Sequence, residues 1–362
     1  MTSASAAAGP FKVIVQPSGR TFSVDAGEAI LPAAIRQGIG MPYGCKDGAC
    51  GSCKCKKLEG TVVHGVHQAK ALSAEEQAAG YILTCCGVPQ TDVVIESKQV
   101  TDQSAFPVRK MPSRVLSMEK RSHDVVVLKM QLPANDTMRF HAGQYVEFIL
   151  RDGARRSYSM ANAPHLLVQE TGPGTTAPVI ELHVRHMPGG KFTDHVFTAM
   201  KEKEILRLEG PYGSFYLRED SDKPMILLAS GTGFAPIKAI IEHMLFKGVQ
   251  RPATLYWGGR RPGDLYLDDW VKAQMAALPN LKYVPVISDA LPEDNWTGRT
   301  GFVHRAVVED FPDMSGMQVY ACGAPIVVDS AREEFSSRCQ LPPDEFHADA
   351  FTTEKDKHGE VA

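Results

Sequence analysis

The feature that most constrains the fold is a short loop with three cysteines, Cys45, Cys50 and Cys53, in the pattern C-x4-C-x2-C. A plant-type [2Fe-2S] cluster takes its thiolate ligands with this spacing. Two irons and two sulfides need four thiolates, and three of them have to come from one loop that folds around the cluster. The loop therefore predicts a protein that transfers single electrons.

Three glycines in and beside this loop, Gly44, Gly48 and Gly51, fit the same interpretation. Glycine has no Cβ atom, so the backbone can approach the inorganic sulfides and can adopt positive φ angles where the loop turns tightly. We therefore expect backbone amides to point at the sulfurs, where hydrogen bonds tune the reduction potential.

The fourth thiolate has to arrive from a distant segment, and Cys85 and Cys86 are the candidates. We favour Cys85 because residues 81–84, Tyr-Ile-Leu-Thr, have the composition of a strand that would deliver it from a packed face. A disulfide pair and a zinc site are the alternatives to a cluster, but zinc favours two C-x2-C pairs and the second pair is absent. The other cysteines are expected to be small buried apolar residues, namely Cys55, Cys322 and Cys339.

Length and charge narrow the class of protein. A chain of 362 residues holds two or three domains. The net charge is −3 and no basic stripe occurs, so no nucleic-acid partner is expected. No apolar stretch reaches the roughly 18 residues of a membrane span, and the first ten residues lack the features of an export signal. Eight cysteines, four of them assigned to iron, fit a reducing cytoplasm.

The hydrophobic pattern changes along the chain and predicts three domains. A strand hairpin, a helix over about residues 27–37 and a capping box at Ser73 and Glu76 favour a β-grasp fold. Short alternating strands such as residues 125–130 then indicate an antiparallel barrel. Beyond residue 220, continuous apolar runs alternate with helices, which is typical of a doubly wound α/β domain. The predicted boundaries are a flexible tail (1–10), the β-grasp domain (11–98), a linker (99–112), the barrel (113–218), the α/β domain (219–351) and a tail (352–362).

Three short motifs lie in the second and third of these domains. They are Arg156-Ser157-Tyr158-Ser159, Gly189-Gly190-Lys191-Phe192-Thr193 and the loop from Gly231 through Thr232 and Gly233 to Pro236. A flavin needs an aromatic neighbour for its ring, a donor near N5, and cations and amides for its pyrophosphate. Tyr158 can stack on the ring, Ser159 can reach N5, and Arg156 can pair with phosphate.

The glycine pair Gly189-Gly190 begins a helix, and free N–H groups with the positive end of the dipole bind phosphate at such a point. Each motif also has an alternative without a cofactor. Arg156 could be a surface residue and Tyr158 part of the barrel core, and Gly189-Gly190 could be an ordinary turn. The loop from Gly231 to Pro236 is by itself a weak nucleotide signal, because Ala235 stands where a third glycine is usual.

In this order, the three motifs resemble those of the ferredoxin-NADP reductase superfamily. With the cluster domain in front, the chain is similar to oxygenase reductases such as those of benzoate, phenol and methane oxidation, and most of all to CDP-6-deoxyglucoseen reductases. The resemblance covers about residues 11–351. It implies a [2Fe-2S] ferredoxin domain, an FAD-binding barrel and an NAD(P)-binding domain, with no residue acting as a catalytic acid or base.

The resemblance also implies roles for further residues. The strand that ends at His183, Val184 and Arg185 would line the flavin, and Gly231, Thr232 and Gly233 would bind the nicotinamide nucleotide. Cys322 and Gly323 lie where nicotinamide would approach the flavin, although Cys322 could be ordinary core packing. Phe351 would cover the other face of the flavin, or else anchor the core.

The nicotinamide cofactor is expected to be NADH, with NADPH possible. Arg260 and Arg261 follow a strand end where a 2′-phosphate could sit, but Arg260 could also contact ribose or diphosphate, or be solvated. His64 and His67 lie near the cluster loop, but a Rieske site needs two cysteines paired with two histidines. We therefore expect both histidines to be surface residues.

Together these features predict an electron route from NADH to FAD, then to [2Fe-2S], and then to a separate terminal oxygenase, either a monooxygenase or a dioxygenase. One alternative acceptor is a deoxysugar dehydrase, as for a CDP-6-deoxyglucoseen reductase. Another alternative is a self-contained flavoenzyme that reduces a small molecule directly. The sequence leaves the acceptor and the oligomeric state open.

Overall fold

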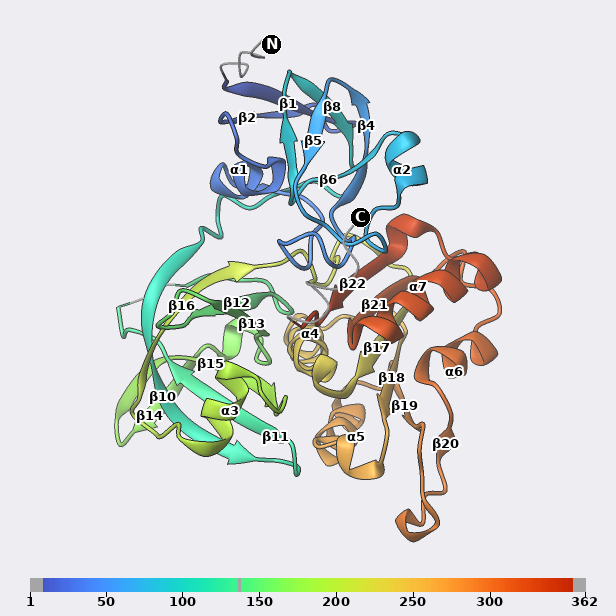
Figure 1. Cartoon of the computed structure of the whole chain (residues 1–362). Coiled ribbons are helices and arrows are strands. Elements are labelled where there is room, and N and C mark those ends of the chain that lie inside the picture. Colours follow the sequence, from blue (N-terminus) through green and yellow to red (C-terminus); the bar gives the residue numbers. More distant parts are fainter. Residues whose placement is uncertain (1–8, 136–137, 354–362) are drawn as a thin grey trace. The chain divides into compact units, whose positions relative to one another are not determined.

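The computed structural model describes residues 9–135 and 138–353, and the chain divides into two compact units (Figure 1). The first unit comprises residues 1–107 and 352–362, and the second comprises residues 108–351. The predicted tails, 1–10 and 352–362, lie largely outside the described residues. No helix among the described residues is long and apolar enough to cross a membrane.

The first unit is built on a mixed five-stranded sheet with the order β2-β1-β8-β4-β6. Only the β1–β8 pair is parallel. The strands are β1 (Phe11–Gln16), β2 (Arg20–Val24), β4 (Lys54–Glu59), β6 (Tyr81–Leu83) and β8 (Val93–Glu96). Two short pairs complete the unit, namely β3 (Ile39–Gly40) with β9 (Thr101–Asp102) and β5 (Val62–His64) with β7 (Gly87–Pro89).

Local sequence explains the helices of this unit. Helix α1 (Ile30–Arg36) carries Pro32 in its first turn, where a missing N–H costs nothing. Gly38 ends the segment with φ of +71°. Helix α2 (Ala74–Ala78) begins with the predicted capping box, since Ser73 and Glu76 each accept the other's backbone N–H.

The first half of the second unit is an antiparallel sheet with the order β13-β12-β16-β10-β11-β15-β14. An isolated bridge from Met160 to Leu182 brings β13 and β15 together and so closes the sheet into a barrel. The elements are β10 (Arg109–Lys120), β11 (Val125–Gln131), β12 (Tyr145–Ile149), β13 (Arg155–Ser159), β14 (Val168–Gly172), β15 (Thr175–Arg185), β16 (Ile205–Tyr212), η1 (Pro164–Leu166) and α3 (Lys191–Thr198).

The predicted linker, residues 99–112, is shorter in the structure than in the sequence analysis. Its first part contains β9, which pairs with β3, and its last four residues form the beginning of β10. Met111 is 4% exposed and packs in the barrel core. The sequence analysis did not predict the beginning of β10 because this segment contains two prolines and mixed polar residues.

The second half of the unit is a parallel six-stranded sheet with the order β20-β19-β18-β17-β21-β22. Helices α4 and α5 cover one face and α6 and α7 the other (Figure 1). The elements are β17 (Met225–Ser230), η2 (Gly231–Gly233), α4 (Phe234–Lys247), β18 (Ala253–Gly259), η3 (Pro262–Asp264), α5 (Asp268–Ala277), β19 (Leu281–Ile287), β20 (Arg299–Thr300), α6 (Val303–Asp310), β21 (Gln318–Gly323), α7 (Pro325–Cys339) and β22 (Phe346–Ala350).

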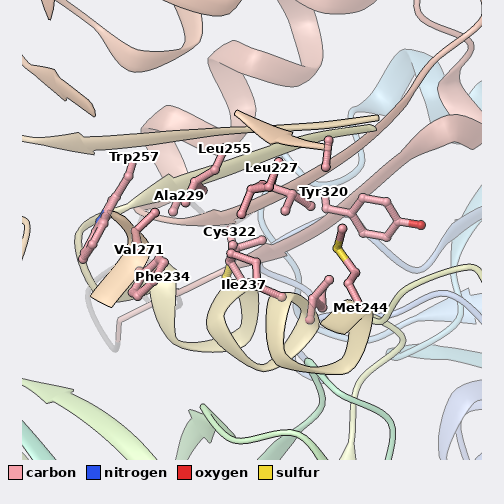
Figure 2. Close-up of a cluster of buried hydrophobic side chains, with 14 of the residues drawn as sticks. Leu227, Ala229, Phe234, Ile237, Met244, Leu255, Trp257, Val271, Tyr320 and Cys322 are labelled. Carbon is pink, nitrogen blue, oxygen red and sulfur yellow. The ribbon is translucent and has the colours of Figure 1, made fainter. Parts of the chain in front are cut away.

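The order of this sheet reverses between β17 and β21, and the carboxyl ends of such neighbouring strands form the usual ligand crevice of a doubly wound fold. The glycine loop after β17 and Cys322 at the end of β21 both lie there. Figure 2 shows the core between this sheet and α4, in which Ile237 lies next to Cys322 and the side chain of Met244 points toward Tyr320.

Candidate cofactor-binding sites

The cysteine loop holds two of its sulfurs side by side. The amide of Cys45 lies 3.4 Å from Sγ of Cys50, and the amide of Cys50 lies 3.3 Å from Sγ of Cys45. The amide of Ser52 lies 3.5 Å from the same Cys50 sulfur. Backbone N–H groups thus point at the sulfurs, as the glycine-rich sequence predicts.

A second pair of sulfurs is formed by Cys53 and Cys85, which are both buried. The side chain of Cys85 is hydrogen-bonded to that of Cys53, and this contact, with further contributions from Cys86 and from burial, raises the pKa of Cys85. Thr84, directly before it, donates to the carbonyl oxygen of Cys53 through its amide, at 3.4 Å. Strand β6 therefore brings Cys85 to the loop.

The arrangement fits a dinuclear cluster better than a single zinc ion. Two irons need two thiolates each. The loop supplies the pair Cys45/Cys50 and also Cys53, and the segment after β6 supplies Cys85 as the partner of Cys53. Among the described residues, the trio whose ligand atoms all lie within 4.8 Å of one another is His123, Asp124 and Asp264, and no three cysteines do so. A tetrahedral zinc site would need all four sulfurs around one point. None of the eight cysteines forms a disulfide.

Two glycines of the cysteine loop lie so close to residues 66–71 that a larger side chain would not fit. Gly48 has φ of +76°, and a Cβ atom there would lie 2.9 Å from Cβ of His67. Gly51 has φ of +72°, and its Cβ would lie 3.2 Å from the carbonyl oxygen of Ala71. Residues 66–71 therefore pack directly against the loop and hold its shape.

The prediction that His64 and His67 are surface residues is wrong for His67. Its side chain is buried, its Nδ1 lies 2.9 Å from the carbonyl oxygen of Gly65, and its Nε2 contacts Gln77 at 3.2 Å. His64 is half-buried and accepts the amide of Leu83 at 3.3 Å. His64 thus contacts β6, and His67 packs against the cluster loop at Gly48. The sequence analysis considered the two histidines only as metal ligands and did not predict these structural roles.

Strand β13 presents the first flavin motif in an extended conformation, so its side chains alternate between two faces. Arg156 and Tyr158 share one face, and Ser157 on the other donates to Glu147 at 3.5 Å. The ring of Tyr158 lies 5.1 Å from that of Phe192, and burial raises the pKa of its hydroxyl. Arg156 donates to the carbonyl oxygen of Arg155 at 2.7 Å.

Ser159, at the end of the same strand, is buried and donates to Asp349 Oδ2 at 3.3 Å. Asp349 lies in β22 of the other half of the unit, and Phe351 follows two residues later. The amide of Phe351 donates to the carbonyl oxygen of Gly323 at 2.8 Å. Asp349 is a residue that the sequence analysis missed, and the available signal was a single carboxylate between two alanines in a mostly apolar segment.

The start of α3 contains the second motif. Gly189 has φ of +83°, and Gly190 is the residue before the helix. Thr193 donates to the carbonyl oxygen of Met187 at 2.9 Å, and the exposed Lys191 pairs with Asp152 at 2.5 Å. The first-turn amides have no partner within a helix, so this end can receive an anion.

Phe192 differs from the other members of the motif because its side chain belongs to the barrel core. It is 2% exposed and stacks on Phe148 with ring centroids 4.7 Å apart. Its side chain anchors α3 to the barrel, and only its backbone amide is available to a phosphate.

The side chains at the end of β15 contact other protein groups, whereas the resemblance implies that they line the flavin. His183 is buried, with Nε2 lying 3.0 Å from Glu181 Oε1 and Nδ1 lying 2.7 Å from the hydroxyl of Tyr266. Val184 is fully buried in the barrel core. Arg185 pairs with Asp124 at 2.8 Å.

The glycine loop after β17 is crowded on every side. A Cβ atom at Gly233 would lie 2.1 Å from the carbonyl oxygen of Cys322, and one at Gly231, where φ is +54°, would lie 2.6 Å from Arg185 Nη1. Trp257 Nε1 donates to the carbonyl oxygen of Gly231 at 3.0 Å. Thr232 is buried between the two glycines.

Cys322 and Gly323 end β21 directly beside this loop. Cys322 is fully buried among the apolar residues of the core, as Figure 2 shows. Gly323 has φ of +128°, and a Cβ atom there would lie 2.4 Å from the carbonyl oxygen of Ser230. The ends of β17 and β21 therefore touch each other through glycine.

Arg260 and Arg261 are both engaged with carboxylates. Arg260 Nε lies 3.2 Å from Asp264 Oδ2, which also accepts the Arg260 amide at 2.9 Å. Arg261 Nε lies 2.7 Å from Asp294 Oδ2. The sequence analysis did not foresee Asp264, which shapes the turn that positions Arg260.

Three protein-family models match successive parts of the chain. A 2Fe-2S iron-sulfur cluster binding domain matches residues 13–90, an oxidoreductase FAD-binding domain matches residues 112–216, and an oxidoreductase NAD-binding domain matches residues 227–333. The predicted fold class, the cofactors [2Fe-2S], FAD and NAD(H), and the oxidoreductase class are confirmed. The individual site residues remain predictions.

Relatives match almost the whole chain. The CDP-6-deoxy-L-threo-D-glycero-4-hexulose-3-dehydrase reductase of Yersinia pestis is 39% identical over 95% of this chain and 99% of its own length. The terephthalate 1,2-dioxygenase reductase component 2 of Comamonas sp. is 34% identical over 94% and 97%. The crystal structure of the Amycolatopsis cytochrome P450 reductase GcoB aligns with a TM-score of 0.75 and 34% identity, covering 95% of this chain and 99% of that chain.

Proposed function

Because this chain belongs to the ferredoxin-NADP reductase superfamily, in the group with an N-terminal [2Fe-2S] ferredoxin domain, we propose that it delivers electrons from NADH to a separate terminal oxygenase. The observation that carries the proposal is the near full-length match to reductase components of oxygenases. When bound, FAD would supply two-electron chemistry with NADH, and a [2Fe-2S] cluster would supply one-electron transfer to the acceptor. The polypeptide supplies position, electrostatics and exclusion of water.

The four cysteines of the two sulfur pairs, Cys45/Cys50 and Cys53/Cys85, are proposed to hold the cluster. In the barrel, Tyr158 offers a ring face, and Arg156 with the first amides of α3 provides positive charge for a pyrophosphate. Ser159 donates its hydroxyl proton to Asp349, so in this arrangement its oxygen can accept a hydrogen bond but does not donate to flavin N5, the role that the sequence analysis gave it.

The charges around Arg260 favour NADH over NADPH. Its guanidinium contacts Asp264 at 3.2 Å and lies 3.8 Å from Asp124. A 2′-phosphate would have to displace these carboxylates and would be repelled by them, whereas a ribose hydroxyl can donate to a carboxylate. Arg261 is also paired, with Asp294.

The first experiment is an absorption and EPR spectrum of the purified full chain, followed by anaerobic titration with NADH and with NADPH. We expect flavin and [2Fe-2S] signals and reduction of both by NADH. Cytochrome c then serves as a one-electron acceptor, and terminal oxygenases with aromatic substrates serve as protein acceptors. Material without iron and labile sulfide would refute the proposal.

A second candidate acceptor is the dehydrase of a CDP-linked 6-deoxyhexulose, because the relative from Yersinia pestis is 39% identical to this chain. Parallel reconstitutions with such a dehydrase and with an oxygenase separate the two. Turnover of a small molecule by the chain alone would instead support a self-contained flavoenzyme. The proposed location is the reducing cytoplasm, which rests on the cysteine content of the sequence.

A further inference from the structure

Helix α4 has two buried faces with different chemistry. Ile237, Ile240, Ile241 and Met244 lie on one face and pack under the parallel sheet (Figure 2). The opposite face contacts the barrel and is polar as well as apolar, which is unusual for a helix covered on both sides. The residues on this barrel-facing side are Lys238, Ala239, Glu242 and Phe246, at the spacing i, i+1, i+4 and i+8.

Small residues allow α4 to approach the barrel closely. Ala239 is fully buried in a cluster with Ala142 and Ala163 of the barrel. At the second-last residue of the helix, the ring of Phe246 stacks on that of His165 with centroids 4.1 Å apart. The helix that follows the glycine loop is therefore in contact with the flavin-binding barrel along its length.

Lys238 is at the centre of this contact and is 6% exposed. Its ammonium lies 2.6 Å from Glu242 Oε1, 3.2 Å from Glu181 Oε1 and 3.1 Å from the carbonyl oxygen of Ala161. Glu242 in turn accepts the amide of Ala163 at 2.9 Å. One lysine of the nucleotide domain is thus bonded to β15, which ends in predicted flavin contacts, and to the segment that directly follows the predicted flavin motif of β13.

The network continues from Glu181 to His183 and then returns to the nucleotide domain. A carboxylate can only accept, so His183 Nε2–H donates to Glu181 at 3.0 Å and Nδ1 accepts the hydroxyl of Tyr266 at 2.7 Å. The Tyr266 ring packs edge-on against Trp257, whose Nε1 donates to Gly231. The path from Lys238 therefore ends at the glycine loop that α4 follows.

The protonation states agree with this order of bonds. Burial alone would raise the pKa of Glu181, but His183 and the charge of Lys238 lower it to about 2. Burial lowers the pKa of His183 in spite of Glu181, so the imidazole is neutral. Glu181 is thus a fixed anion beside the Lys238 cation, and the imidazole holds one tautomer.

We infer that Lys238 is a positioning residue, which fixes the nucleotide domain on the flavin barrel and thereby sets the distance between the nicotinamide and the flavin. The inference rests on hydride transfer from NADH to FAD. None of the partners of Lys238 belongs to the glycine loop, so its role is to set geometry and not to bind the nucleotide. A displacement of about 1 Å between reacting groups costs on the order of 100-fold in rate.

The test compares Lys238→Met with Lys247→Met, a control on the same helix whose side chain is 46% exposed. We expect Lys238→Met to slow flavin reduction at saturating NADH by roughly tenfold or more, while the NADH dissociation constant changes by less than about threefold. The isotope effect with 4-deuterated NADH should rise because the hydride crosses a longer distance. Without NADH, hydrogen exchange should increase in residues 179–185 and 231–247.

Lys238→Met leaves two buried carboxylates without their cation and can impair folding. The triple variant Glu181→Gln/Lys238→Met/Glu242→Gln removes all three charges at similar volume and should fold and bind FAD, yet show the same slow flavin reduction and faster exchange. Wild-type rate, isotope effect and exchange in the triple variant would overturn the inference. Loss of FAD that accounts for the whole decrease would overturn it as well. Failure of the wild type to oxidise NADH would instead concern the proposed function.

Discussion

Ser159 and Asp349 share a hydrogen bond of 3.3 Å although 190 residues separate them in the chain. Ser159 ends the barrel strand β13, Asp349 lies in the edge strand β22, and both are buried. The bond therefore joins the flavin barrel to the nucleotide domain at the serine that we propose lies beside flavin N5. Asp349 pairs with Cys322 of the neighbouring strand β21. Burial, together with the negative charge of Asp349, raises the pKa of the Cys322 thiol.

The first prediction concerns Asp349→Asn. The amide has nearly the same shape, but the hydrogen bond of Ser159 loses its charge, a difference of about 1–2 kcal/mol or roughly tenfold in a rate. We expect the FAD content to stay unchanged and flavin reduction by NADH to slow by about tenfold in stopped-flow measurements. Asp344→Asn, at an exposed position of the short 3-10 helix Pro343–Glu345 before β22, is the control. Equal rates in both variants would show that the carboxylate does not position Ser159.

The second prediction separates the two candidate ligands at the end of β6. Cys85 faces Cys53, whereas Cys86 is half-buried, with its carbonyl oxygen accepting the amide of Gly65. Cys85→Ser should abolish the [2Fe-2S] EPR signal and cytochrome c reduction, while NADH still bleaches the flavin. Cys86→Ser should keep the cluster and near wild-type rates. The opposite pattern would assign the fourth ligand to Cys86.

Much of the fold could be predicted because local patterns and tertiary structure agree. The alternation of β1 and β2, the capping box at Ser73 and the apolar runs of β17 and β21 each identify an element before any contact is known. The beginning of β10 was missed because its residues are polar and include Pro112, and pairing with β16 decides its conformation.

The site could be predicted only in part, for a physical reason. Motifs identify residues whose backbone conformation or ligand chemistry is restricted, such as Cys50, Gly231 and Gly233. They do not identify residues that act through a partner distant in sequence, such as Asp349, Glu181 and Lys238. Phe192 illustrates the converse, because it belongs to a motif but its side chain packs in the barrel core.

The third prediction concerns the contact between Gly233 and β21. A Cβ atom at Gly233 would lie 2.1 Å from the carbonyl oxygen of Cys322, which is backbone and cannot rotate away. Gly233→Ala should therefore displace the loop, weaken NADH binding by at least about tenfold and lower the unfolding temperature. Gly263→Ala, in the same domain, has open space around its Cβ and should resemble the wild type. NADH titration and thermal unfolding measure both effects, and tight NADH binding by Gly233→Ala would contradict the assignment of the loop.

The fourth prediction concerns stability in acid and begins with His347 in β22. Its side chain is 5% exposed and lies against Tyr320, with ring centroids 4.9 Å apart. Burial and the positive charges of Arg218 and Arg251, partly opposed by Asp344, lower its pKa from the ordinary 6.5 to about 3. Among the described residues, Nε2 has no hydrogen-bond partner, so a proton there would be poorly accommodated.

A histidine whose pKa is depressed by folding contributes stability that is complete above its unfolded pKa and is lost as the pH falls toward the folded pKa. His347 should therefore make the second unit less stable between pH 6.5 and about 3. One pKa unit corresponds to about 1.4 kcal/mol, so near pH 5 the loss is about 2 kcal/mol. His347→Asn cannot take up this proton, and in urea unfolding its stability should fall less steeply with acid than that of the wild type. His123→Asn, at a side chain 71% exposed, is the control. The same acid dependence in wild type and His347→Asn would place the sensitive group elsewhere.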